Sequence, residues 1–177
     1  MTYSCREYQG ELPTFRLGNM DLEDARQLIP TGFAPISFDR KRFVAVHHSA
    51  TEPTATIEAI HRYHVDQGYG GFGYDIATTF DSRAILAGNL NTKRAGVAFN
   101  NDVCYHVLMI GNFTKAHPPA AQLAITRRVC AELQQACGRW LPIVPHNIFN
   151  RENEYYSNCP GLTWPQWWGE IMRKVGE

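Results

Sequence analysis

Short apolar runs alternate with stretches of helical periodicity along most of this chain. The segment FVAVH at Phe43–His47 is apolar and rich in β-branched residues, so it predicts a buried strand. Apolar residues recur at helical spacing from Leu123 to Cys137 and predict a long helix, with Gly138 as its C-terminal cap. Interleaved strands and helices are typical of α/β proteins. We therefore predict a central mixed β-sheet flanked by helices.

Weaker patterns predict the remaining elements. They are a helix that starts at Pro53 or Thr54 and ends at Gly68, a hairpin of Tyr74–Phe80 with Arg83–Leu86, strands at Val103–Ile110 and Leu141–Val144, and a last helix capped by Thr163. The last helix carries an aromatic stripe that includes Trp164, Trp167 and Trp168, which is typical of a helix packed on a core.

Residues 1–40 contain several prolines and glycines and show little periodicity. We interpret them as an N-terminal arm packed on a domain of residues 41–177. A short helix is predicted near Leu22–Leu28, and the regular core is predicted to begin at Phe43. The N-terminal stretch MTYSCREYQGELP is polar and lacks the apolar segment of a signal peptide. We therefore expect synthesis in the cytoplasm, with release needed for any action outside.

Composition excludes several classes of function. The 177 residues include 17 basic and 17 acidic side chains, so the formal net charge is zero and no nucleic-acid partner is expected. No run of about 18 apolar residues is present to span a membrane. The five cysteines are an odd number in a chain long enough to bury a core without disulfides. We expect a monomer without a disulfide framework.

Three short motifs carry residues that are able to do chemistry. VHHSAT at Val46–Thr51 and VPHN at Val144–Asn147 each place a histidine where a short strand ends, and NCPG at Asn158–Gly161 places a cysteine in a turn. Two neutral imidazoles and a thiolate suit Zn²⁺, with a fourth position left for water. The wide sequence spacing favours an open catalytic site over a structural zinc knuckle. Taken singly, each of these residues is more often structural.

The ordered set VHHSAT, HRYHVDQGYGGFGYD, MIGNF and PHN…NCPG resembles the zinc-dependent N-acetylmuramoyl-L-alanine amidases, which include phage endolysins and peptidoglycan recognition proteins. The resemblance runs from Phe43 to the last helix. It implies one Zn²⁺ per chain, bound by His47, His146 and Cys159. It also implies hydrolysis of the amide bond between N-acetylmuramic acid and L-alanine in peptidoglycan.

The resemblance assigns further roles. Tyr74 matches a tyrosine that donates a hydrogen bond to the oxyanion or orients the water, and this role is favoured over the alternative of an aromatic residue that packs at the start of a strand. Ser157 stands two residues before the cysteine, where many members have a lysine or threonine that assists catalysis. Thr51 and Asn100 are candidate substrate contacts, but Asn-Asn is also ordinary turn chemistry.

Other positions depart from the family pattern or are predicted to be structural. Val97 falls near the place where many members have the histidine of a Gly-x-His-Ala loop. His48 is expected to face away from the cleft, because side chains alternate along a strand. The remaining histidines are predicted to be structural or exposed: His61, His64, His106 and His117.

The interpretation that these residues favour is a phage-type lytic endolysin. A non-catalytic peptidoglycan-binding protein is the alternative from another class, and the presence of Cys159 argues against it. An amidase that recycles soluble muropeptides and a zinc peptidase that cuts the stem peptide are further alternatives.

Overall fold

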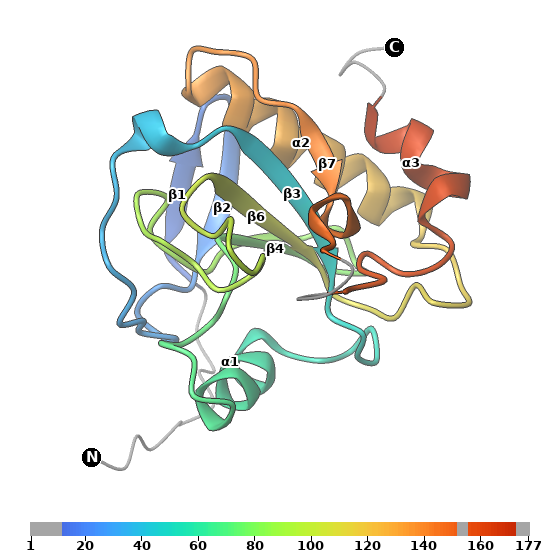
Figure 1. Ribbon diagram of the computed structural model, residues 1–177, viewed down its shortest axis with the longest axis horizontal. Coiled ribbons are helices and arrows are strands. Elements are labelled where there is room, and N and C mark those ends of the chain that lie inside the picture. The colour runs from blue at the N-terminus through green and yellow to red at the C-terminus, as the bar shows by residue number, and fades with distance from the viewer. Residues whose placement is uncertain (1–11, 152–155, 173–177) are drawn as a thin grey trace.

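A mixed β-sheet runs through the protein (Figure 1). The computed structural model describes residues 12–151 and 156–172, and within them the sheet has seven strands. In spatial order they are β1 (Thr14–Leu17), β2 (Met20–Asp24), β5 (Ala84–Leu86), β4 (Ile76–Thr78), β6 (Cys104–Met109), β3 (Phe43–His48) and β7 (Ile143–Pro145). The β1–β2 and β4–β5 pairs are antiparallel and the other pairs are parallel. The predicted mixed sheet is confirmed.

Helices cover both faces of the sheet. α2 (Ala120–Ala136) and α3 (Trp164–Met172) pack on one face, where Val44 and Val46 of β3 join their core. α1 (Ile57–Asp66) packs on the other face, where Ile57 and Ile60 meet Leu108 of β6 (Figure 1). Two short 3₁₀ helices, η1 (Phe38–Arg40) and η2 (His146–Phe149), complete the structure of the described residues.

The predicted helices and strands of the central region are confirmed, with shifts at their ends. β3 extends one residue beyond the predicted strand, to His48. α1 starts later than predicted, because the Thr56 side chain accepts a hydrogen bond from the Ala59 amide and so caps the helix. In the last helix Trp167 is buried as predicted, while the Thr163 hydroxyl donates to the Phe113 carbonyl and accepts from the Trp167 indole N–H rather than from a backbone amide of the first turn.

The N-terminal segment corrects one prediction. The expected short helix near Leu22–Leu28 is wrong, because Met20–Asp24 forms β2 and pairs in parallel with β5. Met20 and Leu22 are buried while Asp21 is exposed, which is the two-residue period of a strand. The core therefore begins before Phe43, with Leu17 of β1. Residues 1–11 and Cys5 among them lie outside the described residues.

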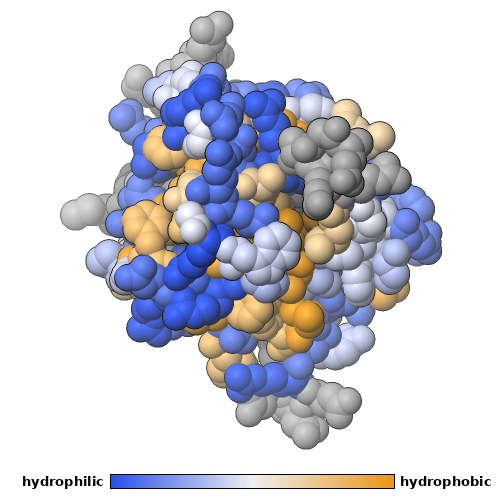
Figure 2. Space-filling model, turned by 90° about the horizontal axis from the view of Figure 1, so that it is seen from above, coloured by the Kyte–Doolittle hydropathy of each residue, from blue (hydrophilic) through white to orange (hydrophobic). Residues whose placement is uncertain are grey.

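The surface is mixed in character. The face in Figure 2 intersperses hydrophilic and hydrophobic residues. In the part of the chain that the structure describes, no helix combines the length and apolar character needed to cross a membrane.

Cys104, Cys130, Cys137 and Cys159 are free thiols.

Candidate metal centre

The carboxyl ends of two parallel strands carry the two candidate histidine ligands. β3 and β7 are neighbours in the sheet, with Val46 opposite Pro145. His47 follows Val46 on β3, and His146 follows Pro145 at the start of η2. Ligand sites in open α/β sheets lie at the carboxyl ends of strands. The sheet pairing therefore brings together two histidines that are distant in the sequence.

Cys159 reaches the same place from a turn. The Asn147 amide donates a hydrogen bond of 2.9 Å to the Cys159 carbonyl, and the His48 amide donates one of 3.3 Å to the Cys159 sulfur. The ligand atoms of His47, His146 and Cys159 all lie within 4.8 Å of one another, and all three side chains are buried. The structure thus gathers the three residues that the sequence motifs nominated.

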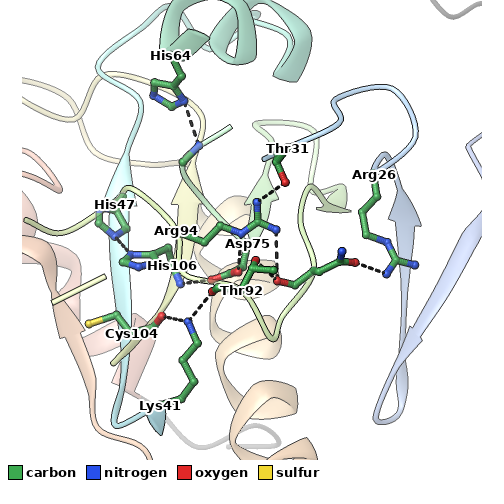
Figure 3. Close-up of polar contacts among 12 residues, drawn as sticks. Arg26, Thr31, Lys41, His47, His64, Asp75, Thr92, Arg94, Cys104 and His106 are labelled. Carbon is green, nitrogen blue, oxygen red and sulfur yellow. Dashed lines mark hydrogen bonds and ion pairs between the residues drawn. The ribbon is translucent and has the colours of Figure 1, made fainter. Parts of the chain in front are cut away.

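Both ring nitrogens of His47 face neighbouring polar groups. Nδ1 lies 3.7 Å from the sulfur of Cys159, and the His47 ring centroid lies 4.7 Å from that of His146. Nε2 lies 3.2 Å from Nδ1 of His106, a residue of the neighbouring strand β6 (Figure 3). The side chain of His47 is completely buried, so these contacts fix its orientation.

Burial sets the protonation of the cluster. It lowers the pKa of His47 well below its usual value, and the charges of His146, His106 and His48 act in the same direction. It lowers the pKa of His146 to about 4. Both imidazoles are therefore neutral at pH 7, the form that binds a metal. Burial raises the pKa of the Cys159 thiol to about 12, and the hydrogen bond from the His48 amide opposes this shift.

The donor set fits a zinc ion. A thiol that burial keeps protonated becomes a stable thiolate when a divalent cation lies beside it. Two histidines and one cysteine, with a fourth position for water, are the ligands of a catalytic zinc site. Among residues 12–151 and 156–172, this is the one cluster of three or more His, Cys, Asp or Glu side chains with ligand atoms close enough to hold a metal.

Tyr74 lies beside this cluster. Its ring centroid is 4.9 Å from that of His47, and its side chain is half-buried. The ring also contacts His64 and Phe72, with centroids 5.5 and 5.6 Å away. Tyr74 therefore has both a position next to a candidate ligand and packing partners. The sequence left these two roles open, and the geometry is compatible with both.

Two histidines of α1 hold the loop that precedes Tyr74. His61 Nδ1 accepts a hydrogen bond of 3.1 Å from the Phe72 amide, and His64 Nδ1 accepts one of 3.2 Å from the Gly73 amide. These contacts give structural roles to two histidines that lacked assigned partners at the level of sequence. They also position the segment that carries Tyr74 against the cluster.

Ser157 supports the cysteine turn. Its hydroxyl oxygen accepts a hydrogen bond of 3.1 Å from the Cys159 amide. Its backbone amide and carbonyl bond to the side-chain amide of Asn150, at 2.8 and 2.9 Å. The contacts of Ser157 thus fix the turn on which Cys159 sits.

Thr51 and Asn100 make hydrogen bonds within their own loops. Thr51 Oγ1 lies 2.7 Å from the hydroxyl of Ser49, and Asn100 Nδ2 donates to the Ala98 carbonyl at 3.3 Å. Thr51 also lines a cavity of about 510 Å³ together with Asn112. These contacts do not link either residue to the cluster.

Sequence reasoning missed the importance of His106. This residue was predicted to be structural or exposed, yet its fully buried ring contacts the candidate ligand His47. The sequence feature that could have indicated this role is the position of a histidine within the otherwise apolar run CYHVLM. The contact with His47 could not be predicted from the sequence, because the parallel pairing of β6 with β3 joins segments far apart in the chain.

His48 faces the other side as predicted, and its Nδ1 accepts a hydrogen bond from the Phe113 amide.

Comparison with known proteins identifies the fold. No protein-family model and no curated protein matches the sequence. The Ph2119 endolysin from a Thermus scotoductus bacteriophage has a TM-score of 0.68 at 17% identity, over 80% of this chain and 90% of that chain. The N-acetylmuramoyl-L-alanine amidase LysC from Clostridium intestinale URNW has a TM-score of 0.67 at 19% identity, over 78% of this chain and 87% of that chain.

A third solved structure extends the comparison to recognition proteins. Peptidoglycan recognition protein-LE, in complex with tracheal cytotoxin, has a TM-score of 0.69 at 18% identity, over 79% of this chain and 87% of that chain. Identities at this level show a shared fold. The chain therefore has the α/β fold of the N-acetylmuramoyl-L-alanine amidase endolysins and the peptidoglycan recognition proteins, as its motifs predicted.

Proposed function

We propose that the protein is a zinc-dependent N-acetylmuramoyl-L-alanine amidase that acts on bacterial peptidoglycan. The observation that carries the proposal is the buried cluster of His47, His146 and Cys159, whose ligand atoms lie within 4.8 Å of one another. The fold shared with amidase endolysins supports it. The reaction breaks the amide bond between the lactyl group of N-acetylmuramic acid and L-alanine, with addition of one water molecule.

Each side chain of the site has a separate role in this reaction. His47 and His146 offer neutral ring nitrogens to the metal, and Cys159 offers a sulfur that already accepts a hydrogen bond from the His48 amide. A bound zinc ion supplies Lewis-acid activation of water and of the amide carbonyl at neutral pH. Tyr74, beside His47, is the group that we assign to hydrogen bonding with the negative charge that develops on the carbonyl oxygen. Ser157 holds the Cys159 turn.

The biological role that we propose is that of a phage-type lytic endolysin. Similarity in fold to a bacteriophage endolysin supports this role. The protein would be made in the cytoplasm and would act on the cell wall after release. Whole peptidoglycan sacculi are then its substrate, whereas an amidase that recycles wall fragments would prefer soluble muropeptides.

One observation favours a second candidate function. The fold is also that of peptidoglycan recognition protein-LE, which was solved with a bound peptidoglycan fragment. A protein that binds peptidoglycan without cleaving it is therefore the alternative. Such a protein has no need for a complete metal-binding cluster, so the metal content separates the two candidates.

The test combines metal content with hydrolysis. Purified wild-type protein and Cys159→Ser are analysed for zinc and then incubated with purified sacculi, and turbidity and newly released amino groups are followed. We expect one zinc per wild-type chain and lysis, with both lost in the variant. Mass spectrometry of the products should show a free L-alanine amino terminus. A zinc-loaded wild type that binds sacculi and releases no amine would refute the amidase proposal.

A further inference from the structure

His106, on the neighbouring strand β6, makes a direct contact between side chains with the candidate ligand His47. Its Nδ1 lies 3.2 Å from Nε2 of His47, and the two ring centroids are 5.3 Å apart (Figure 3). Both side chains are completely buried. Because water does not reach this contact, each ring nitrogen in it depends on the other for a hydrogen bond.

We propose that His106 is a positioning residue that holds His47 in the one neutral form able to bind the metal through Nδ1. The inference rests on the metal site of the proposed function. A neutral imidazole carries its proton on one nitrogen and offers the other as an acceptor or ligand. Nδ1 of His47 faces Cys159, so binding a metal jointly with Cys159 requires the His47 proton to reside on Nε2. His106 Nδ1 is the acceptor for that buried N–H.

The contact admits a second arrangement, in which His106 donates and His47 accepts. The proton of His47 would then sit on Nδ1, facing Cys159, and this nitrogen would be blocked as a ligand. His106 favours metal binding only when its own proton is on Nε2. The nitrogen that carries the His106 proton thus decides whether Nδ1 of His47 is free to bind the metal. Hydrogen-bond partners of metal-bound histidines commonly have this effect.

The chain makes room for the His106 ring at Gly96. A Cβ atom at this position would lie 2.6 Å from Nδ1 of His106 and 3.0 Å from its Cγ. The first distance is shorter than Cβ contacts in folded proteins allow, and the second is tighter than most of them. The missing side chain at Gly96 therefore lets the loop before β6 pass directly over the ring, and this passage fixes the ring against His47.

A buried charged group holds the backbone of His106. The His106 amide donates a hydrogen bond of 2.8 Å to Oδ2 of Asp75, and the Asp75 amide donates one of 3.0 Å to the His106 carbonyl. Arg94 Nε donates to Oδ1 of the same carboxylate at 3.1 Å, and both side chains are completely buried. Lys41, also buried, donates to the Cys104 carbonyl on β6 (Figure 3).

These contacts form a continuous support behind the ligand. Asp75 fixes the main chain of His106, and Arg94 compensates the buried charge of Asp75. Gly96 leaves space for the ring, and the ring presents an acceptor to His47. A buried carboxylate with two bonded partners is costly to place in a core. The presence of the Asp75 carboxylate at this position is explained if β6 must hold His106 in a fixed orientation.

The experiment measures zinc affinity, without any substrate, by competition with a chelator of known affinity. The two variants are His106→Leu, which keeps bulk and removes the acceptor, and His106→Asn, whose side-chain oxygen is able to replace Nδ1 as acceptor. Loss of a partner of a metal-bound histidine typically weakens metal affinity about 10- to 100-fold. We expect this loss in His106→Leu and recovery of most of the affinity in His106→Asn.

Nitrogen-15 spectra of the zinc-loaded wild type give an independent readout. We expect His47 to carry its proton on Nε2 and to bind zinc through Nδ1. Equal zinc affinity in His106→Leu and wild type, with both folded by circular dichroism, would overturn the inference, and so would zinc bound through Nε2 of His47. If His106→Leu does not fold, Gly96→Ala replaces it, since the added methyl would push Nδ1 of His106 away from Nε2 of His47. Unchanged zinc affinity in that variant would also overturn the inference.

Failure of this inference is distinguishable from failure of the proposed function. A wild type whose zinc affinity depends on His106, but which releases no amine from sacculi, refutes the amidase and supports the positioning role. A wild type that lyses sacculi and whose zinc affinity is indifferent to His106→Leu supports the amidase and refutes the positioning role.

Discussion

The backbone amide of His48 donates a hydrogen bond of 3.3 Å to the sulfur of Cys159. This contact joins the end of a central strand to a turn near the C-terminus. It also opposes the rise in the thiol pKa that burial causes, because an N–H donor stabilises the thiolate. The strand that supplies the candidate ligand His47 therefore also stabilises the thiolate of a second candidate ligand, Cys159.

Replacing Cys159 tests the cluster as a metal site. In Cys159→Ser we expect loss of stoichiometric zinc and of lytic activity, because a hydroxyl is a much poorer zinc ligand than a thiolate. Cys137→Ser is the matched control, since Cys137 lies on the α2 side of the sheet and contacts Tyr105. Elemental analysis and sacculus turbidity check both variants. Zinc retained in Cys159→Ser would show that the metal binds elsewhere.

Tyr74→Phe separates the catalytic role of this residue from packing. The substitution keeps the ring that packs beside His47 and removes the hydroxyl. We expect the rate of amide hydrolysis to fall about 100- to 1,000-fold, which is typical for loss of one oxyanion donor, while zinc content stays at the wild-type level. Tyr63→Phe, at an exposed position on α1, serves as control. An unchanged rate in Tyr74→Phe would leave this residue with packing alone.

Asp75→Asn is expected to destabilise the fold strongly. The carboxylate is buried between Arg94 and the His106 amide, and its loss leaves the Arg94 charge without compensation. Breaking a buried pair in this way costs about 3–5 kcal/mol of the free energy of unfolding. Urea unfolding of the metal-free protein measures the loss.

The control for Asp75→Asn is Asp21→Asn. Asp21 pairs with Arg16 on the surface, where both side chains are more than half exposed. Exposed ion pairs contribute about 1 kcal/mol or less. Equal losses in the two variants would contradict a special role for the buried pair.

The metal-free protein is expected to lose stability in mild acid. Burial lowers the pKa of His64 from 6.5 to about 4, so between these values the unfolded chain binds a proton that the folded chain does not. Stability then falls as pH falls through this window, and it is fully present above it. Unfolding in urea with a chelator present, at several pH values, measures the slope.

His64→Gln should reduce this slope. The variant has no titrating group at the position, and the glutamine oxygen is able to accept the hydrogen bond of the Gly73 amide that His64 Nδ1 now accepts. Identical pH profiles for the variant and the wild type would show that His64 does not contribute. His48, whose burial lowers its pKa to about 4, acts in the same direction and remains in both proteins.

Local patterns in the sequence were sufficient for the central elements. The short β-branched apolar run of β3 is typical of a buried strand, and the apolar stripe of α2 recurs with the period of a helix. β2 was missed because its alternation covers only five residues, and one strand of that length has little periodic signal. Its assignment as a strand depends on its partners, β1 on one side and Ile85 and Leu86 of β5 on the other.

The sequence by itself nominated the candidate ligands, because its ordered motifs resemble those of the zinc amidases, although each histidine or cysteine taken singly is more often structural. Only the tertiary structure decided that His47, His146 and Cys159 meet, because the parallel pairing of β3 with β7 and the returning turn are contacts between distant segments. It alone also placed His106 against His47 and Asp75 beneath it. Burial shifts the pKa of a histidine or a carboxylate, and a local sequence pattern does not predict which distant residues the fold will bury together.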